Sequence, residues 1–233
     1  MTNKYPGKIC ASIAERTLEK ALSTAGAVES CSDIIEIRLD LLDSPRIAPF
    51  IEGIKKPLLF TNRADWEGGF FCGTEEARLS ILHEAIDRKA AYIDIEVKTE
   101  DALKLPLIAK AKDQGCTSIA SWHSFTSTPS APALKAILQE QYRSGAQIGK
   151  IVTMAQNFHD VLRVLDLQNQ ASELGFPLIA FCMGSYGIVS RIATLNLGGF
   201  MTYASTDEAK ETAPGQLPAS TVRKILEEIN CGN

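Results

Sequence analysis

Eight short segments rich in β-branched and other apolar residues alternate with longer amphipathic patterns along the chain of 233 residues. The amphipathic patterns repeat apolar residues at i, i+3, i+4 and i+7, as helices do when one face packs against a core. Strands that alternate with helices predict parallel βα units. The average repeat, 233/8, is about 29 residues, close to that of a typical (β/α)8 barrel. The expected strands cover residues 8–14, 34–40, 57–63, 92–97, 117–124, 147–155, 177–184 and 199–205.

We therefore predict an α/β fold, a (β/α)8 TIM barrel, with residues 1–233 as a single domain. A doubly wound open sheet is the alternative, because it is built from the same βα units. No linker rich in proline, glycine or serine divides the chain. A helix is expected to stop at Gly175, just before Pro177, and the last helix is expected near residues 218–229.

The composition argues against several classes of partner. A formal net charge of −4 leaves no positive excess for nucleic acid or an anionic membrane. No apolar run approaches the roughly 20 residues that span a bilayer, and the N-terminus lacks the apolar core of a signal peptide. The cysteines form no CxxC pair, so we expect reduced thiols in a cytoplasmic protein and no metal site. They are Cys10, Cys31, Cys72, Cys116, Cys182 and Cys231.

Charged residues alternate with apolar ones in two of the expected strands, IIEIRLD at 34–40 and YIDIEV at 92–97. A barrel explains this pattern, since one strand face packs against helices and the other points inward. Interior charges are costly unless they pair or line a site. An edge strand with one solvated face is the alternative for either segment alone. The charged residues on the predicted interior face are Glu36, Arg38, Asp40, Asp94 and Glu96.

Further charged or titratable residues, Arg63, His123 and Lys150, fall in or at the ends of three other strands. Lys150 interrupts the apolar run AQIGKIVTMA and follows His123 by one βα repeat, so their strands should be neighbours about 4.8 Å apart. Apolar burial would lower the lysine pKa and make the amine a nucleophile, whereas the carboxylates of the 92–97 strand would raise it. A structural ion pair and a catalytic amine both remain open on this evidence.

Eight motifs in order along the chain resemble type I 3-dehydroquinate dehydratases. They coincide with the strand ends predicted above, and together they span most of the chain. The motifs are EIRLD (36–40), TNR (61–63), EGG (67–69), YIDIE (92–96), SWHSF (121–125), GKIVTMA (149–155), MGSYGIVSR (183–191) and TAPGQ (212–216).

The resemblance implies a (β/α)8 barrel that dehydrates 3-dehydroquinate to 3-dehydroshikimate in aromatic amino acid biosynthesis. It implies no metal or cofactor, and a homodimer. By resemblance Lys150 forms a Schiff base with the substrate, His123 is the general acid and base, and Glu67 orients His123. Arg191 would hold the substrate carboxylate, and Gln216 would help close the site. The substrate-binding residues implied in this way are Glu36, Arg38, Arg63, Met183, Arg191, Thr212 and Gln216.

The sequence departs from the family pattern at three places. Thr212 stands where serine is usual, Phe181 stands where methionine is common, and only about seven residues precede the first strand. The first change keeps a hydroxyl, the second is expected to alter packing only, and the third concerns the barrel floor.

Two other functions are compatible with a lysine in a barrel strand. A class I aldolase or transaldolase-like barrel should carry a glycine-rich phosphate loop after strand seven or eight. The nearest candidate, MGSYG at 183–187, leads to Arg191 and so favours a carboxylate. A barrel that only binds its ligand would show affinity without turnover.

Overall fold

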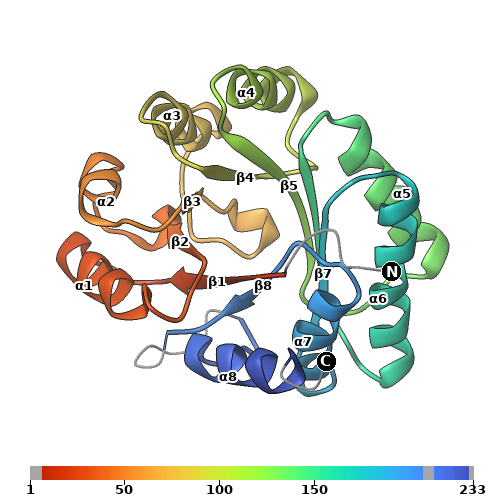
Figure 1. The fold of residues 1–233 in the computed structure, drawn as a ribbon. Coiled ribbons are helices and arrows are strands. Elements are labelled where there is room, and N and C mark those ends of the chain that lie inside the picture. The colour runs from red at the N-terminus through yellow and green to blue at the C-terminus, as the bar shows by residue number, and fades with distance from the viewer. Residues whose placement is uncertain (1–6, 207–212, 231–233) are drawn as a thin grey trace.

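The computed structural model describes residues 7–206 and 213–230. Eight parallel strands form one sheet in the order β7-β6-β5-β4-β3-β2-β1-β8, which curves into a barrel surrounded by helices (Figure 1). The predicted TIM barrel is confirmed, and the open doubly wound sheet is wrong. The strands are β1 Lys8–Ile13, β2 Ile34–Arg38, β3 Leu58–Thr61, β4 Tyr92–Glu96, β5 Thr117–Ser124, β6 Ile148–Met154, β7 Leu178–Met183 and β8 Met201–Ala204.

Helices follow the strands on the outside of the barrel, and several begin at a side chain that caps the first turn. Thr17, Thr74 and Asn157 each accept a hydrogen bond from a backbone N–H three residues later. Gly175, with φ +63°, follows the α6 helix, as predicted. The helices are α1 Leu18–Val28, α2 Ala48–Gly53, α3 Glu75–Asp87, α4 Asp101–Asp113, α5 Ala131–Arg143, α6 Phe158–Glu173, α7 Ile188–Asn196 and α8 Ala219–Asn230, with short 3₁₀ turns η1 Leu39–Leu41, η2 Asp65–Glu67 and η3 Ser185–Gly187.

The barrel closes between β8 and both of its neighbours. Strand β8 pairs with β1 along four residues, whereas toward β7 the Phe200 N–H donates to the Leu178 carbonyl at 2.9 Å. At the floor, the Lys8 ammonium lies 3.4 Å from the Tyr92 hydroxyl and 5.1 Å from the centre of the Phe200 ring. Side chains in or directly before the strands therefore lie at the floor. Residues 1–6 are outside the described part.

Two apolar layers form because each strand sends alternate residues to opposite faces. In β2, Ile35 and Ile37 pack outward with the helices, and Ile34 joins the barrel interior. Glu36 shares that inner face, as the alternation predicted. Apolar residues fill most of the interior, and the charged residues of the pocket lie toward the end where the strands stop. The interior cluster consists of Cys10, Ile34, Leu59, Ile119, Ile148, Val152, Ile179, Phe181, Met183, Met201 and Tyr203.

Five cysteines fall in the described part of the chain, and all are free thiols. Cys10, Cys116 and Cys182 are buried, which agrees with the structural role expected from sequence. Cys231 lies outside the described residues. Within residues 7–206 and 213–230, no helix is long and apolar enough to cross a membrane.

Candidate active site

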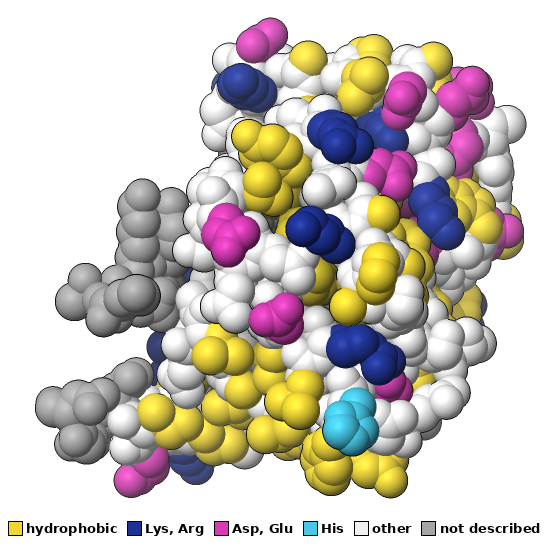
Figure 2. All heavy atoms as spheres, turned by 90° about the vertical axis from the view of Figure 1, so that its right-hand side faces the viewer, with side chains coloured by type: hydrophobic (Ala, Val, Ile, Leu, Met, Phe, Trp, Pro, Cys, Tyr) yellow, Lys and Arg dark blue, Asp and Glu magenta, His cyan; other side chains and the backbone are white. Residues whose placement is uncertain are grey.

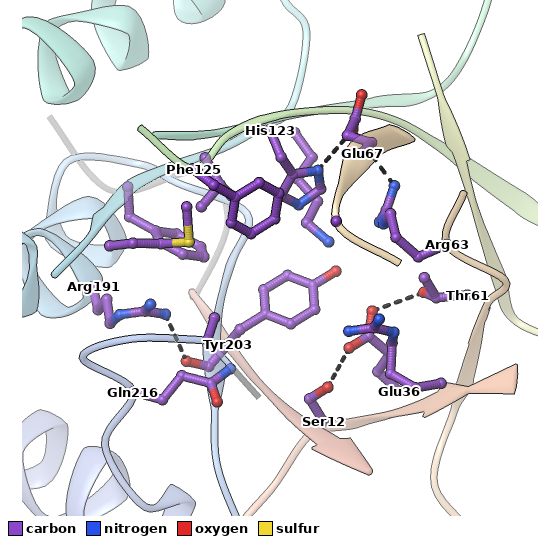
Figure 3. Close-up of a pocket in the computed structure, with 17 residues that line it drawn as sticks. Ser12, Glu36, Thr61, Arg63, Glu67, His123, Phe125, Arg191, Tyr203 and Gln216 are labelled. Carbon is purple, nitrogen blue, oxygen red and sulfur yellow. Dashed lines mark hydrogen bonds and ion pairs between the residues drawn. The ribbon is translucent and has the colours of Figure 1, made fainter. Parts of the chain in front are cut away.

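A pocket of about 540 Å³, counting its open mouth, lies at the carboxyl ends of the strands (Figure 3). Nine of the ten predicted site residues line it; the tenth, Thr212, lies outside the described residues. This end of a barrel is where enzymes of this fold carry their active sites. Eight other residues also line the pocket: Ser12, Thr61, Gly68, Phe125, Val152, Phe181, Tyr203 and Ala213.

The Lys150 amine projects from β6 into this pocket, and the residue is only 4% exposed. Strand β6 pairs with β5, Lys150 opposite Ser121 and Val152 opposite His123, so the predicted neighbouring strands are confirmed. Lys150 Nζ donates to Asp94 Oδ2 at 3.1 Å. The ion pair and the pocket position, which the sequence left as alternatives, therefore occur together.

A buried charge network extends from Lys150 across β4 to helix α3. Arg63 donates from Nη2 to Asp94 at 2.7 Å and from Nη1 to Glu96 at 2.9 Å. Arg78, fully buried, donates to the other Glu96 oxygen at 2.6 Å. Each carboxylate is thus held by at least two donors, which offsets the cost of burying its charge.

Asp94 stays ionised beside the lysine. Burial raises the pKa of its carboxyl, but the cations of Arg63 and Lys150 outweigh burial and hold this pKa well below its usual range. Ser121 adds a hydrogen bond to Asp94 at 2.6 Å. The result is a fixed negative charge next to the Lys150 amine.

His123 and Glu67 form a second buried pair, with His123 Nδ1 at 2.8 Å from Glu67 Oε1 (Figure 3). Burial lowers the pKa of His123 well below its ordinary value, and the Arg63 and Lys150 cations lower it further. Burial also raises the pKa of Glu67 to about 8, with Arg63 opposing that rise. Both shifts favour an uncharged pair at neutral pH, which leaves the imidazole free to accept a proton.

Phe125 covers this pair at the rim of the pocket. Its ring stacks on His123 at 6.0 Å between centres, with an interplanar angle of 13°. Gly68 permits this position, since a Cβ there would lie 2.4 Å from the Phe125 ring, and its φ is +75°. The glycine that follows Glu67 therefore lets an aromatic ring pack directly over the histidine.

Glu36 and Arg38 lie on the β2 side of the pocket, as predicted. Glu36 accepts hydrogen bonds from Ser12 and, at 2.7 Å, from Thr61. Arg38 forms a two-point contact with Asp40, at 2.8 and 2.7 Å. Asp40, predicted on the same strand face, lies instead in the η1 turn after β2 and does not line the pocket, but its contact orients Arg38.

Arg191 reaches the opposite wall from helix α7. Its guanidinium lies 4.6 Å from the centre of the Phe181 ring and donates to the carbonyls of Tyr203, at 3.4 Å, and Pro214, at 3.1 Å. Met183 is buried in the same wall, and Gln216 closes it from the loop before α8. A cation is thereby presented to the pocket on an otherwise apolar side.

Two residues that touch the network were not among the predicted site residues. Tyr203 lines the pocket from β8. Its only signal in the sequence was its spacing of two residues from Met201, which places both side chains on the inner face. Arg78 gave no signal at all, because a charged residue in an amphipathic helix usually faces solvent. Within the described ranges, no group of three or more His, Cys, Asp and Glu side chains could hold a metal ion.

The family model for type I 3-dehydroquinase matches residues 9–232. The 3-dehydroquinate dehydratase of Desulfotalea psychrophila is 43% identical over 219 residues, which cover 94% of this chain and 96% of that protein. The protein of the same name from Methanococcus maripaludis is 34% identical, covering 95% of this chain and 100% of its own length.

Solved structures agree. Type I 3-dehydroquinate dehydratase from Clostridium difficile, solved with covalently modified comenic acid, matches with a TM-score of 0.90 and 25% identity over 99% of this chain and 95% of that one. The Geobacillus kaustophilus 3-dehydroquinate dehydratase matches with a TM-score of 0.87 and 28% identity, covering 97% of this chain and 91% of that one. A Vibrio cholerae 3-keto-L-gulonate-6-phosphate decarboxylase shares the fold alone. Its TM-score is 0.62 and its identity 15%, over 96% of this chain and 98% of that one. By the family match and these relatives, the chain belongs to the type I 3-dehydroquinase family.

Proposed function

We propose that this protein converts 3-dehydroquinate to 3-dehydroshikimate and water through an imine on Lys150. The observation that carries the proposal is the buried Lys150 amine in the pocket, one strand from His123. The relatives named 3-dehydroquinate dehydratase support the choice of substrate. A hydro-lyase of this kind needs an electron sink and a mobile proton, and these two residues supply them.

The covalent steps follow from the chemistry of an amine and a ketone. The neutral Lys150 amine adds to the ring ketone, and loss of water gives an iminium. The adjacent carbon then releases a proton to His123, and its electron pair moves into the iminium to form an enamine. The enamine expels the β-hydroxyl, which leaves as water with a proton from His123. Hydrolysis of the resulting conjugated iminium frees the product and the amine.

Burial and nearby cations lower the pKa of His123, so the resting ring is neutral and has a nitrogen that can accept the first proton. The same lowered pKa makes the protonated ring a good acid for the second transfer. Glu67 holds Nδ1, which directs the other ring nitrogen toward the bound substrate. General acid–base catalysis of this kind contributes about 10²–10⁴-fold in rate.

The remaining pocket residues would bind the substrate. Arg191 pairs with its carboxylate, since a planar guanidinium matches two carboxylate oxygens. Glu36, Arg38 and Arg63 contact its hydroxyls, and Met183 packs against its ring. Gln216 helps to close the site. Thr212 would add a hydroxyl contact from a part of the chain outside the described residues.

An absorbance assay tests this proposal directly. Turnover of 3-dehydroquinate should produce the absorbance of a conjugated enone. Borohydride added during turnover should leave a reduced substrate adduct on Lys150, detectable by mass spectrometry of the intact protein and its peptides. Turnover without an adduct would exclude the imine, and binding without turnover would favour a barrel that only binds its ligand.

We also propose that the protein acts as a homodimer, as the family resemblance implied. Figure 2 looks onto the side of the molecule that carries helix α6, and hydrophobic side chains gather in the lower part of this face. Phe158 and Tyr186 are exposed and in edge contact at 5.1 Å, and Leu162 and Val189 are also exposed. Contiguous exposed apolar residues often mark contact surfaces. Light scattering should give twice the chain mass of 25.3 kDa.

We further propose that residues 1–233 behave as one domain. All eight strands belong to one sheet, and the first and last strands pair with each other, which links the two ends of the described chain. Urea unfolding should therefore give one cooperative transition by fluorescence and by circular dichroism. Two separated transitions would indicate separate folding units.

A further inference from the structure

Tyr203 is a second neighbour of the Lys150 amine, besides Asp94. Its ring centre lies 4.1 Å from Lys150 Nζ, a typical cation–π distance. The side chain is buried on β8, and the ring points into the pocket (Figure 3). The lysine nitrogen therefore contacts both a carboxylate and an aromatic ring face.

Packing holds the Tyr203 ring in this position. The ring lies 6.1 Å from the Phe181 ring, and the backbone carbonyl of Tyr203 accepts from Arg191. The phenol oxygen is buried and makes no hydrogen bond to any described residue. Burial, with Glu36 nearby, raises the pKa of the phenol well above its ordinary value, so the ring stays neutral. Lys150 thus faces the π surface of a neutral ring.

The two contacts respond differently to imine formation. An ammonium has three N–H donors, whereas the protonated imine formed with a ketone keeps only one. Hydrogen bonding to Asp94 therefore has fewer donors available once the iminium forms. A ring face attracts the positive charge itself and needs no N–H. The aromatic contact consequently remains available throughout the cationic steps.

We propose that Tyr203 is a further catalytic residue, whose ring face stabilises the positive charge on Lys150 Nζ in the iminium intermediates. The inference rests on the proposed imine mechanism and adds no bond-making step to it. It assigns a function to an aromatic residue that no charge pattern in the sequence marked.

The test compares kcat for the wild type, Tyr203→Leu and Tyr203→Phe. Removing the ring should lower kcat about 10-fold, the effect expected for a desolvated cation–π contact. Tyr203→Phe keeps the ring and loses a hydroxyl without a described partner, so it should recover most of that loss. Tyr92→Leu, the same change at the barrel floor, is the control and should leave kcat unchanged. Tyr203→Met, which fills space without a ring, replaces the leucine variant if that one does not fold.

Borohydride trapping separates this inference from the proposed function. If the wild type gives neither turnover nor an adduct on Lys150, the imine mechanism itself is wrong. If the wild type is trapped, the leucine variant should give less adduct at matched substrate saturation. A leucine or methionine variant with kcat and adduct within twofold of wild type would overturn the inference. So would a Tyr203→Phe variant as slow as Tyr203→Leu.

Discussion

The two sides of the barrel mouth differ in how they present the pocket. On the β2–β5 side, Glu36, Arg63 and Asp94 are buried charges, each held by several hydrogen bonds. On the β7–β8 side, Phe181 and Tyr203 form an apolar wall. Lys150 on β6 lies at the boundary and touches both.

This difference assigns separate tasks to the two sides. Fixed charges with paired partners cannot reorganise cheaply, so the charged side sets the electrostatic environment of the reacting groups before substrate binds. The apolar wall excludes water and leaves Arg191 as a cation that the substrate can meet with little competition from solvent. Mutations can therefore change the electrostatic environment of the reacting groups and the binding of substrate separately.

The largest expected effect comes from removing the residue that joins the two sides. Lys150→Ala should lower kcat at least about 10⁴-fold, because no other group can form the imine. Lys8→Ala, at the barrel floor, is the matched control and should keep normal kcat. Steady-state kinetics measures both, and near-normal activity of Lys150→Ala would refute the role of the lysine.

The charged side also predicts a pH dependence of stability. Glu67 has its pKa raised from 4.5 to about 8 in the folded protein, so between these values the folded state holds a proton that the unfolded state has lost. The contribution of this proton to the free energy of unfolding is complete below about pH 4.5 and is lost as pH rises through about 8. The total loss is up to about 5 kcal/mol. Glu67→Gln should lack this decline.

Urea unfolding of both proteins at pH 5, 6.5 and 8 measures this effect. The lowered pKa of His123 acts in the opposite direction below about pH 6.5, and it acts in both proteins, so the difference between the two curves isolates Glu67. Parallel curves would show that Glu67 is ionised in the fold.

The outer end of the charge network should matter for stability more than a surface pair. Arg78→Met leaves Glu96 with one fewer buried cation and should reduce the free energy of unfolding by about 3–5 kcal/mol. Arg88→Met, which breaks an exposed pair with Glu84 at 2.7 Å, should cost less than about 1 kcal/mol. Urea unfolding measures both losses. Equal losses in the two variants would mean that the buried network stabilises the fold no more than an exposed ion pair does.

A smaller effect is expected from Arg191, next to the apolar wall. Arg191→Ala should raise KM about 30-fold through loss of a charge-assisted contact to the substrate carboxylate. Arg191→Lys should recover part of this affinity, because it keeps the charge without the two-point geometry. An unchanged KM in steady-state assays of the alanine variant would remove Arg191 from carboxylate binding.

Much of the fold was predictable from local patterns. The expected strand at 34–40 and the observed β2 share a start, and the alternation there assigned Glu36 and Ile37 to the correct faces. Such patterns succeed because strand faces alternate with period 2 wherever one face is buried. They do not give partners: Asp94 and Glu96 looked equivalent, yet only Asp94 contacts Lys150, and Glu96 binds the two arginines.

The sequence by itself determined the order of strands and helices, which face of each strand is apolar, and the positions of Lys150 and His123 on successive strands. These are local properties, set by side-chain periodicity along one segment. Only the tertiary structure decided that Arg78 reaches Glu96 from α3 and that the Tyr203 ring meets the Lys150 amine. Such contacts join segments far apart in the chain, and closure of the barrel brings them within a few ångströms.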